Sequence, residues 1–183
     1  MIGAIVAGGL SAMTAPVTNS YESIMTTVVG SGGASDITFN TIPSIYKHLQ
    51  IRISGKAANN GNVTYRFNSD SASNYSWHSL YGSGSGTPAA YSGASSTLMY
   101  TGEVYTNTSI FSAEIVDILD YADTNKYKTM RTLSGVDLNG SGSIQLDSGL
   151  WRSTSAITTI TILPPSAGSF SQYSSFALYG IKG

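Results

Sequence analysis

The side chains with the greatest potential for chemistry are four carboxylates that recur at every third position, namely Glu114, Asp117, Asp120 and Asp123. Paired carboxylates catalyse glycoside hydrolysis, and clustered carboxylates bind calcium. The alternative, which we favour, is a solvated strand end that leads into a polar loop. Residues 137–142 (DLNGSG) resemble a calcium loop in part, but they lack its alternating aspartates and closing glutamate, and a hairpin turn explains them.

Histidine-dependent catalysis has two candidates, His48 and His78. A nucleophilic triad needs a base beside an oriented serine, and in a chain so rich in serine such proximity carries no information. The G-x-S-x-G elbow of many hydrolases does not occur in the sequence. We therefore expect both histidines to be outward strand residues. The sequence predicts no catalytic residue, no metal site and no cofactor.

Aromatic residues form a different kind of candidate site. Tyr75, Trp77 and Tyr81 fall on one face of a predicted strand, and such rings resemble the platforms that stack sugar rings. If this face is exposed it binds glycan, whereas if it is inward it belongs to the core or to a subunit interface. We favour core or interface, and Trp151 presents the same alternative.

The composition favours one all-β domain. The chain has 183 residues, of which 41% are hydrophobic and only 10% charged, and it is rich in glycine and tyrosine. The net charge of -1 provides no basic surface for nucleic acid. Because cysteine does not occur, disulfides, thiolate nucleophiles and Cys-based metal centres are excluded.

Period-2 alternation and turn residues predict roughly ten antiparallel strands, arranged as a β-sandwich or jelly roll. The predicted strand segments are residues 21–30, 36–41, 48–57, 62–68, 74–82, 97–101, 109–119, 128–138, 143–152, 157–163 and 174–181. Between two of them, residues 83–96 are predicted to form a long Gly/Ser loop that is flexible or lies against a neighbour.

Two turn signals predict hairpins. Asn59-Asn60-Gly61 is expected to join residues 48–57 to residues 62–68 as a hairpin, and Asn139-Gly140 predicts a second one. In the first hairpin, alternation predicts six inward residues, namely Leu49, Ile51, Ile53, Val63, Tyr65 and Phe67. The last segment, residues 174–181, is expected to enter the sheet last. Earlier strands must therefore leave a position free for it.

The first twenty residues are unlike the rest. They contain no charged residue, and they lack the positive region of a signal peptide and the length of a membrane span. A disordered terminus is one interpretation. Because exposed apolar residues would make a free tail adhesive, we expect instead a docking arm, residues 1–20, that orders on a partner subunit. Its anchoring residues would be Met1, Ile2, Ile5, Val6 and Leu10.

Two blocks of sequence, one near each end, carry a family resemblance. The first comprises YESI (21–24), VGSGGAS (29–35), ITF (37–39), IP (42–43) and YKHLQIR (46–52); the second is SFALYGIK (175–182), with RFN (66–68) and NY (74–75) between them. Together they resemble a family of small virion structural proteins of tailed bacteriophages. The resemblance implies a jelly-roll or sandwich module on the particle, attached by an arm. It leaves open whether the module belongs to the head or to the tail.

From these observations we expect a non-enzymatic virion protein, made in the host cytoplasm, with the arm followed by one β-sandwich domain at residues 21–183. Capsid decoration, or cement, is the leading expectation. The expected partners are the major capsid protein or tail proteins and further copies of the chain, with a trimer as one form, but neither nucleic acid nor membrane. The alternative is a tail fibre or baseplate-associated module that binds host glycan through Tyr75, Trp77 and Tyr81. A carbohydrate-active enzyme using Asp117 and Asp120 is a further alternative.

Overall fold

The computed structural model describes residues 20–106 and 109–183, which form two antiparallel β-sheets. The predicted all-β fold is confirmed, with twelve strands and one short 3₁₀ turn in the described residues, compared with the roughly ten strands predicted. The strands are β1 (Tyr21–Val28), β2 (Ile37–Phe39), β3 (His48–Gly55), β4 (Gly61–Phe67), β5 (Tyr75–Gly82), β6 (Ala89–Ser96), β7 (Met99–Val104), β8 (Ser112–Leu119), β9 (Lys128–Asp137), β10 (Gly142–Trp151), β11 (Ile160–Leu163) and β12 (Ser175–Ile181), and the 3₁₀ turn η1 is Pro165–Ala167.

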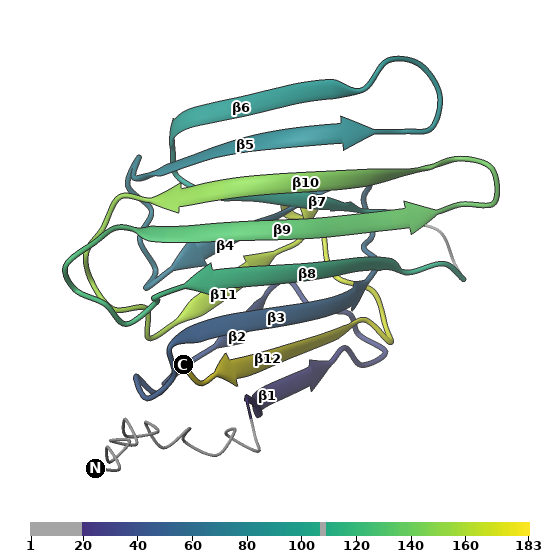
Figure 1. Cartoon of the computed structure of the whole chain (residues 1–183). Helices are drawn as coiled ribbons and strands as arrows, with labels where there is room; N and C mark the ends of the chain where they lie inside the picture. The colour runs from purple at the N-terminus through teal and green to yellow at the C-terminus, as the bar shows by residue number, and fades with distance from the viewer. Residues whose placement is uncertain (1–19, 107–108) are drawn as a thin grey trace, which may run out of the picture.

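The two sheets are layered as a β-sandwich (Figure 1). The large sheet has eight strands in the order β1-β12-β3-β8-β9-β10-β5-β6, and the small sheet has four in the order β2-β11-β4-β7. The C-terminal strand β12 lies between β1 and β3 and pairs with both. The prediction that earlier strands leave a position free for the last strand is therefore confirmed.

The predicted hairpin between residues 48–57 and 62–68 is wrong. Strand β3 lies in the large sheet, paired with β12 and β8, whereas β4 lies in the small sheet, paired with β11 and β7. Alternation correctly identified inward residues on both strands, but it could not show that they face the core from opposite sheets. The Asn59-Asn60-Gly61 turn instead carries the chain across the sandwich, and Gly61 has the positive φ that such a turn favours.

The second predicted hairpin is confirmed. Strands β9 and β10 pair antiparallel along their full length. Asn139 and Gly140 both have positive φ, and the Leu138 N–H donates to the Ser141 carbonyl over 2.8 Å to close the turn.

The predicted loop at residues 83–96 is also wrong in its second half. Residues 89–96 form β6, which pairs with β5 and is the edge of the large sheet. Its sequence AAYSGASS lacks the branched apolar residues that signal a strand, because most of its side chains face solvent at least in part. Only the short segment from Ser83 to Pro88 remains as the connection.

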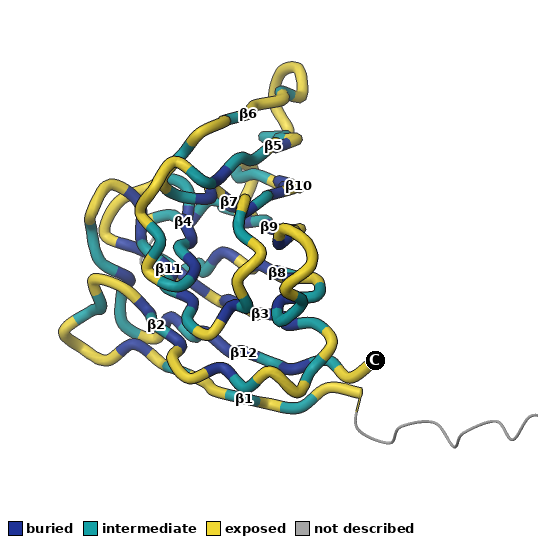
Figure 2. The backbone as a smooth tube through the Cα atoms, turned by 90° about the vertical axis from the view of Figure 1, so that its left-hand side faces the viewer, coloured by how far each residue is buried: buried dark blue, intermediate teal, exposed yellow. Residues whose placement is uncertain are grey.

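The core lies between the inner faces of the two sheets, and Figure 2 shows the buried backbone concentrated there. It is strongly aromatic: Trp151 stacks against Tyr75 with ring centroids 6.4 Å apart and meets Phe67 edge-on at 5.7 Å. The predicted inward residues of β3 and β4 are all buried, namely Leu49, Ile51, Ile53, Val63, Tyr65 and Phe67. Phe176 and Leu178, which share one face of β12, are buried as well.

Strand β7 is the edge of the small sheet, and it packs beneath β10, β9 and β5 of the large one. Two glycines permit this approach, since a Cβ at Gly102 would overlap Ser134 and a Cβ at Gly149 would overlap Met99. Strand β6 lies farther out than β5 at the same end of the sandwich (Figure 1). The β5–β6 hairpin therefore extends past the edge of the small sheet and leaves part of its inner face uncovered.

The predicted docking arm, residues 1–20, lies outside the described residues except for Ser20. Its five proposed anchors, Met1, Ile2, Ile5, Val6 and Leu10, belong to the part of the chain on which the structure gives no description.

Candidate functional site

A pocket of about 430 Å³ opens where the β5–β6 hairpin extends past β7. We call it the aromatic pocket because three ring-bearing side chains line it together with hydroxyl, amide and carboxylate groups. Its lining residues are Asn62, Trp77, Ser79, Tyr81, Tyr91, Ser92, Glu103 and Gln145. They come from five strands of both sheets, so that only the folded sandwich brings them together.

Trp77 is held by the backbone of its neighbour strand. It lies opposite Gly93 of β6, and a Cβ at that position would overlap the indole ring. Tyr100 of β7 approaches the same ring, with centroids 5.4 Å apart. Glycine at position 93 therefore lets the indole lie against the strand, where it forms one wall of the pocket.

Tyr81 and Tyr91 provide the other rings of the pocket. Their centroids are 6.4 Å apart in an edge-to-face arrangement, and Tyr91 is half-exposed. Sequence reasoning missed Tyr91 because it assigned residues 83–96 to a loop. Its position opposite Ser79 in the β5–β6 ladder places it on the same face as the rest of the pocket.

The floor of the pocket is ordered by a buried carboxylate. Asp147 accepts hydrogen bonds from the Thr132 hydroxyl (2.6 Å), the Gln145 amide (2.6 Å) and the Ser79 hydroxyl. Ser79 and Thr132 are its direct cross-strand neighbours on β5 and β9. Bonds to an ionised acceptor are stronger than neutral ones, so Asp147 fixes the orientation of Ser79 and Gln145 at the floor.

A second buried carboxylate, Glu114, belongs to the adjacent inward row of the sheet. Glu114, Ser134, Gln145 and Tyr81 are successive cross-strand neighbours that lead from β8 to the pocket. Burial raises the pKa of Glu114 to about 7, and the charge of Asp147 acts in the same direction. Among the described residues, Glu114 Oε1 has no hydrogen-bond partner.

The rim of the pocket presents hydrogen-bond acceptors. Glu103 accepts at Oε2 from the Tyr105 hydroxyl over 2.6 Å, and the Asn62 amide group donates to the Thr101 carbonyl. Gln145 Nε2 also donates to the Thr101 carbonyl, over 3.2 Å. These bonds fix the orientation of the three side chains. They leave Oε1 of Glu103 and the single amide oxygens of Asn62 and Gln145 as acceptors.

The four aromatic residues singled out from the sequence have separate locations. Tyr75 and Trp151 are buried in the core, whereas Trp77 and Tyr81 line the pocket. The face that carries Tyr75, Trp77 and Tyr81 points inward, but the small sheet covers only the part near Tyr75. The sequence offered no signal for where the small sheet ends over this face.

The four carboxylates at every third position do not converge. Glu114 faces the interior, Asp117 lies on the opposite face and pairs with Arg131 at 3.2 Å, and Asp120 and Asp123 lie beyond β8 in a turn, where both contact Lys126. The alternation of a strand separates them. The favoured interpretation of a solvated strand end that leads into a polar loop fits Asp117, Asp120 and Asp123, but it is wrong for Glu114, which is buried. Across residues 20–106 and 109–183, no group of three His, Asp or Glu side chains is placed to hold a metal ion.

Neither histidine lines the aromatic pocket. His48 accepts at Nδ1 from the Asp120 N–H over 3.0 Å, at the end of β3. His78 lies on β5 with its side chain exposed, on the face opposite Trp77. Neither has a serine hydroxyl bonded to it among the described residues, so no nucleophilic triad is assembled there.

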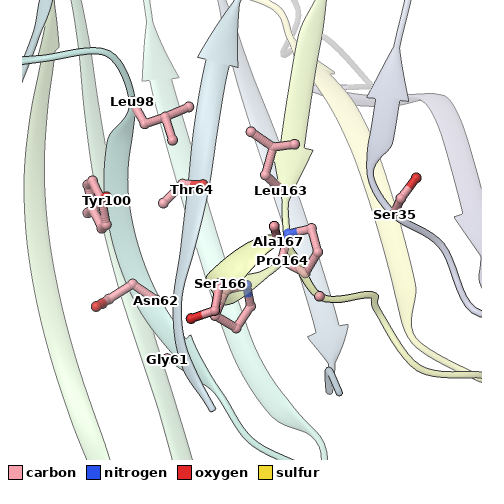
Figure 3. A pocket seen from close by; sticks show the side chains of 12 residues that line it. Ser35, Gly61, Asn62, Thr64, Leu98, Tyr100, Leu163, Pro164, Ser166 and Ala167 are labelled. Carbon is pink, nitrogen blue, oxygen red and sulfur yellow. The ribbon is translucent and has the colours of Figure 1, made fainter. Parts of the chain in front are cut away.

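A second hollow, of about 670 Å³, lies over the small sheet beside η1 (Figure 3). We call it the proline hollow. Its lining residues are Ser35, Gly61, Asn62, Thr64, Leu98, Tyr100, Leu163, Pro164, Pro165, Ser166, Ala167 and Gly168, none of which carries a charge. Asn62 lines both hollows, and Tyr100 lies against Trp77 of the aromatic pocket. The two hollows therefore adjoin along β7.

The outer face of the large sheet carries an exposed apolar row. Ile115, Leu133, Leu146 and Leu80 are direct cross-strand neighbours on β8, β9, β10 and β5, and each is about half exposed. Ile144 extends the row on β10 and is equally exposed. Contiguous apolar surface of this kind is typical of a protein interaction site.

No protein-family model, curated protein or solved structure significantly matches this chain. Within the described ranges, no helix has the length and apolar character needed to cross a membrane.

Proposed function

We propose that this chain is a non-enzymatic structural protein of a bacteriophage particle. In this proposal a jelly-roll-like sandwich acts as a capsid decoration, or cement, protein. Its partners are the major capsid protein and other copies of the chain. The sequence blocks near both ends support the family, and the apolar row on the outer sheet face is the structural observation that carries the proposal.

The apolar row offers useful binding energy. Burying a Leu or Ile side chain completely stabilises an association by about 1.5–3 kcal/mol, and each member of the row is about half exposed, so each retains roughly 1 kcal/mol to contribute. The small net charge of -1 adds little repulsion between copies. The separation of the acidic side chains supports a binding role rather than a hydrolytic one.

Two substitutions on one strand test this proposal. Leu133→Asp places a charge in the centre of the row, whereas Thr129→Asp places one on the same face of β9 away from it. We expect Leu133→Asp to be lost from purified particles while Thr129→Asp is retained, with both proteins equally stable to heat. Equal incorporation of the two variants would overturn the role of this face.

A tail fibre or baseplate-associated module that binds host surface glycan is the second candidate. The aromatic pocket favours it, because aromatic walls with fixed polar groups are typical of small-molecule sites. The abundance of the chain relative to the major capsid protein in purified particles separates the two candidates. A decoration protein is present at a comparable copy number, whereas a tail protein is present at a small fraction of it.

A further inference from the structure

We infer that the aromatic pocket and the proline hollow together form one binding site for a neutral oligosaccharide, and that this site rejects acidic sugars. The inference rests on the second candidate function, glycan binding, and specifies its ligand. Three properties of the site carry it: the polarity of its free groups, its aromatic walls and its charge.

Three polar atoms of the pocket receive no hydrogen bond from the described residues and can only accept one, whereas its tyrosine and serine hydroxyls can both donate and accept and the Trp77 indole N–H can donate. Gln145 uses Nε2 to donate to Asp147, Ser79 and the Thr101 carbonyl, and Asn62 uses its amide nitrogen in the same way toward Thr101. This leaves the side-chain oxygens of Gln145 and Asn62 as acceptors. Oε1 of Glu103 is a third, because the Tyr105 and Ser143 hydroxyls bond Oε2. Among the described residues no donor bonds these three oxygens, so a complementary ligand is rich in hydroxyl donors.

The walls suit the apolar faces of sugar rings. A pyranose has C–H groups on its faces and hydroxyls at its edge, so that it stacks on an aromatic ring while its hydroxyls reach neighbouring acceptors. Tyr91 is half-exposed, and Trp77 is fixed between Gly93 and Tyr100. The rings stand on rigid strands, which reduces the conformational entropy that binding must overcome.

The charge of the site favours a neutral ligand. Glu103 is the one charged side chain among the residues lining the two hollows, and no Lys, Arg or His lines either of them. A carboxylate on the ligand would be repelled by Glu103 and would find no cation to pair with. Uronic acids and sialic acids are therefore disfavoured.

The ligand has more than one sugar ring. The proline hollow adjoins the aromatic pocket at Asn62 and Tyr100, and its lining of uncharged hydroxyl, amide, proline and tyrosine groups continues the same chemistry. Figure 3 shows Asn62 and Tyr100 on the side of the proline hollow opposite Ser35. An oligosaccharide that spans β7 reaches both hollows, whereas a monosaccharide fills one.

The test is calorimetric titration of the purified full chain with neutral tetrasaccharides of glucose, N-acetylglucosamine, mannose and galactose, and with tetragalacturonate and choline. We expect at least one neutral tetrasaccharide to bind more tightly than its monosaccharide, and tetragalacturonate and choline not to bind. Tyr91→Ala should weaken that binding roughly tenfold, as expected for the loss of one stacked ring. Tyr173→Ala, which removes an exposed tyrosine elsewhere, should leave binding unchanged.

Glu103→Gln tests the charge argument. This variant keeps an acceptor oxygen while removing the negative charge, so we expect tetragalacturonate to bind more tightly than it does to the unaltered protein. The inference is overturned if no neutral tetrasaccharide binds, if choline binds in their place, if Tyr91→Ala binds as well as the unaltered protein, or if Glu103→Gln still excludes tetragalacturonate. A chain that is found in particles but binds no sugar refutes this inference and the glycan-binding candidate, and leaves the decoration role standing. A chain that binds sugar but is missing from particles refutes the virion role alone.

Discussion

Replacing Glu114 with glutamine is expected to remove a pH-dependent penalty on folding. The folded protein holds the Glu114 proton up to about pH 7, because burial raises the pKa of this carboxyl, whereas the unfolded chain releases it near pH 4.5. Between these values the folded state binds more protons than the unfolded state. The free energy of unfolding therefore falls as the pH rises through this window, and it stays low above pH 7.

The size of the effect follows from the shift. Each pKa unit corresponds to about 1.4 kcal/mol, so a shift from 4.5 to about 7 costs about 3 kcal/mol at pH 8. Glutamine has the shape of the protonated acid and carries no charge at any pH. We expect Glu114→Gln to match the unaltered protein at pH 4 and to exceed it by about 3 kcal/mol at pH 8. For a chain of this length, that difference raises the melting temperature by roughly 6–12 °C.

Urea unfolding at pH 4, 5, 6, 7 and 8, followed by tryptophan fluorescence, measures this difference, since Trp151 is buried in the core. The control is Asp117→Asn, which removes a carboxylate from the outer face of the same strand, where it pairs with the exposed Arg131. We expect little change for the control. A stability gain for Glu114→Gln that is the same at pH 4 and pH 8, or a loss at pH 8, would refute the reasoning.

Three further substitutions test how the sandwich is held together, each by urea unfolding at neutral pH. Gly102→Ala should destabilise the folded protein by about 1–3 kcal/mol, because the added Cβ would overlap Ser134. The control Gly30→Ala should be nearly neutral, because its Cβ meets no atom within 4 Å. Equal effects of the two substitutions would contradict the close approach of β7 to the large sheet. Tyr75→Phe should lower the free energy of unfolding by about 1–3 kcal/mol, because the Phe67 N–H donates to the buried Tyr75 hydroxyl over 2.9 Å and would lose its acceptor. An unchanged free energy of unfolding would show that this hydrogen bond does not stabilise the fold. Lys128→Met should lower the free energy of unfolding by about 2–5 kcal/mol, since the buried Lys128 ammonium donates to the carbonyls of Asp123, Lys126 and Thr154. The surface substitution Lys126→Met should cost less. The opposite order would contradict a stabilising role for the buried Lys128 ammonium.

Much of the fold was predictable because period-2 alternation directly reports which face of a strand is buried. Leu49, Ile51 and Ile53 were identified as inward in this way, and all three are buried. Alternation does not report which strands are neighbours. Short turns with Asn and Gly occur in both kinds of connection. At residues 59–61 the turn joins strands of different sheets, whereas at residues 139–140 it joins the two strands of a hairpin.

The candidate site was less predictable than the core. Trp77 and Tyr81 were singled out together with Tyr75, and the three share one face of β5, but only the extent of the opposite sheet separates the two pocket residues from the core residue. That extent depends on where β7 ends the small sheet, which involves pairing between distant segments. Tyr91 was missed because an exposed edge strand of small residues looks like a loop.

The apolar row was hidden for a related reason. Leu80, Leu133 and Leu146 lie far apart in the sequence, and only the register of β5, β9 and β10 places them side by side. On each strand alone, a single outward leucine is ordinary. The row becomes an interaction surface only when several strands contribute neighbouring members.

We propose that the chain is a structural component of a bacteriophage particle, held there by its outer sheet face. The most direct measurement is quantitative mass spectrometry of the chain in purified particles. We expect it at a fixed ratio to the major capsid protein, and we expect that ratio to collapse for Leu133→Asp but not for Thr129→Asp. Particles that contain none of the chain, or that retain Leu133→Asp at the unaltered ratio, would contradict the account.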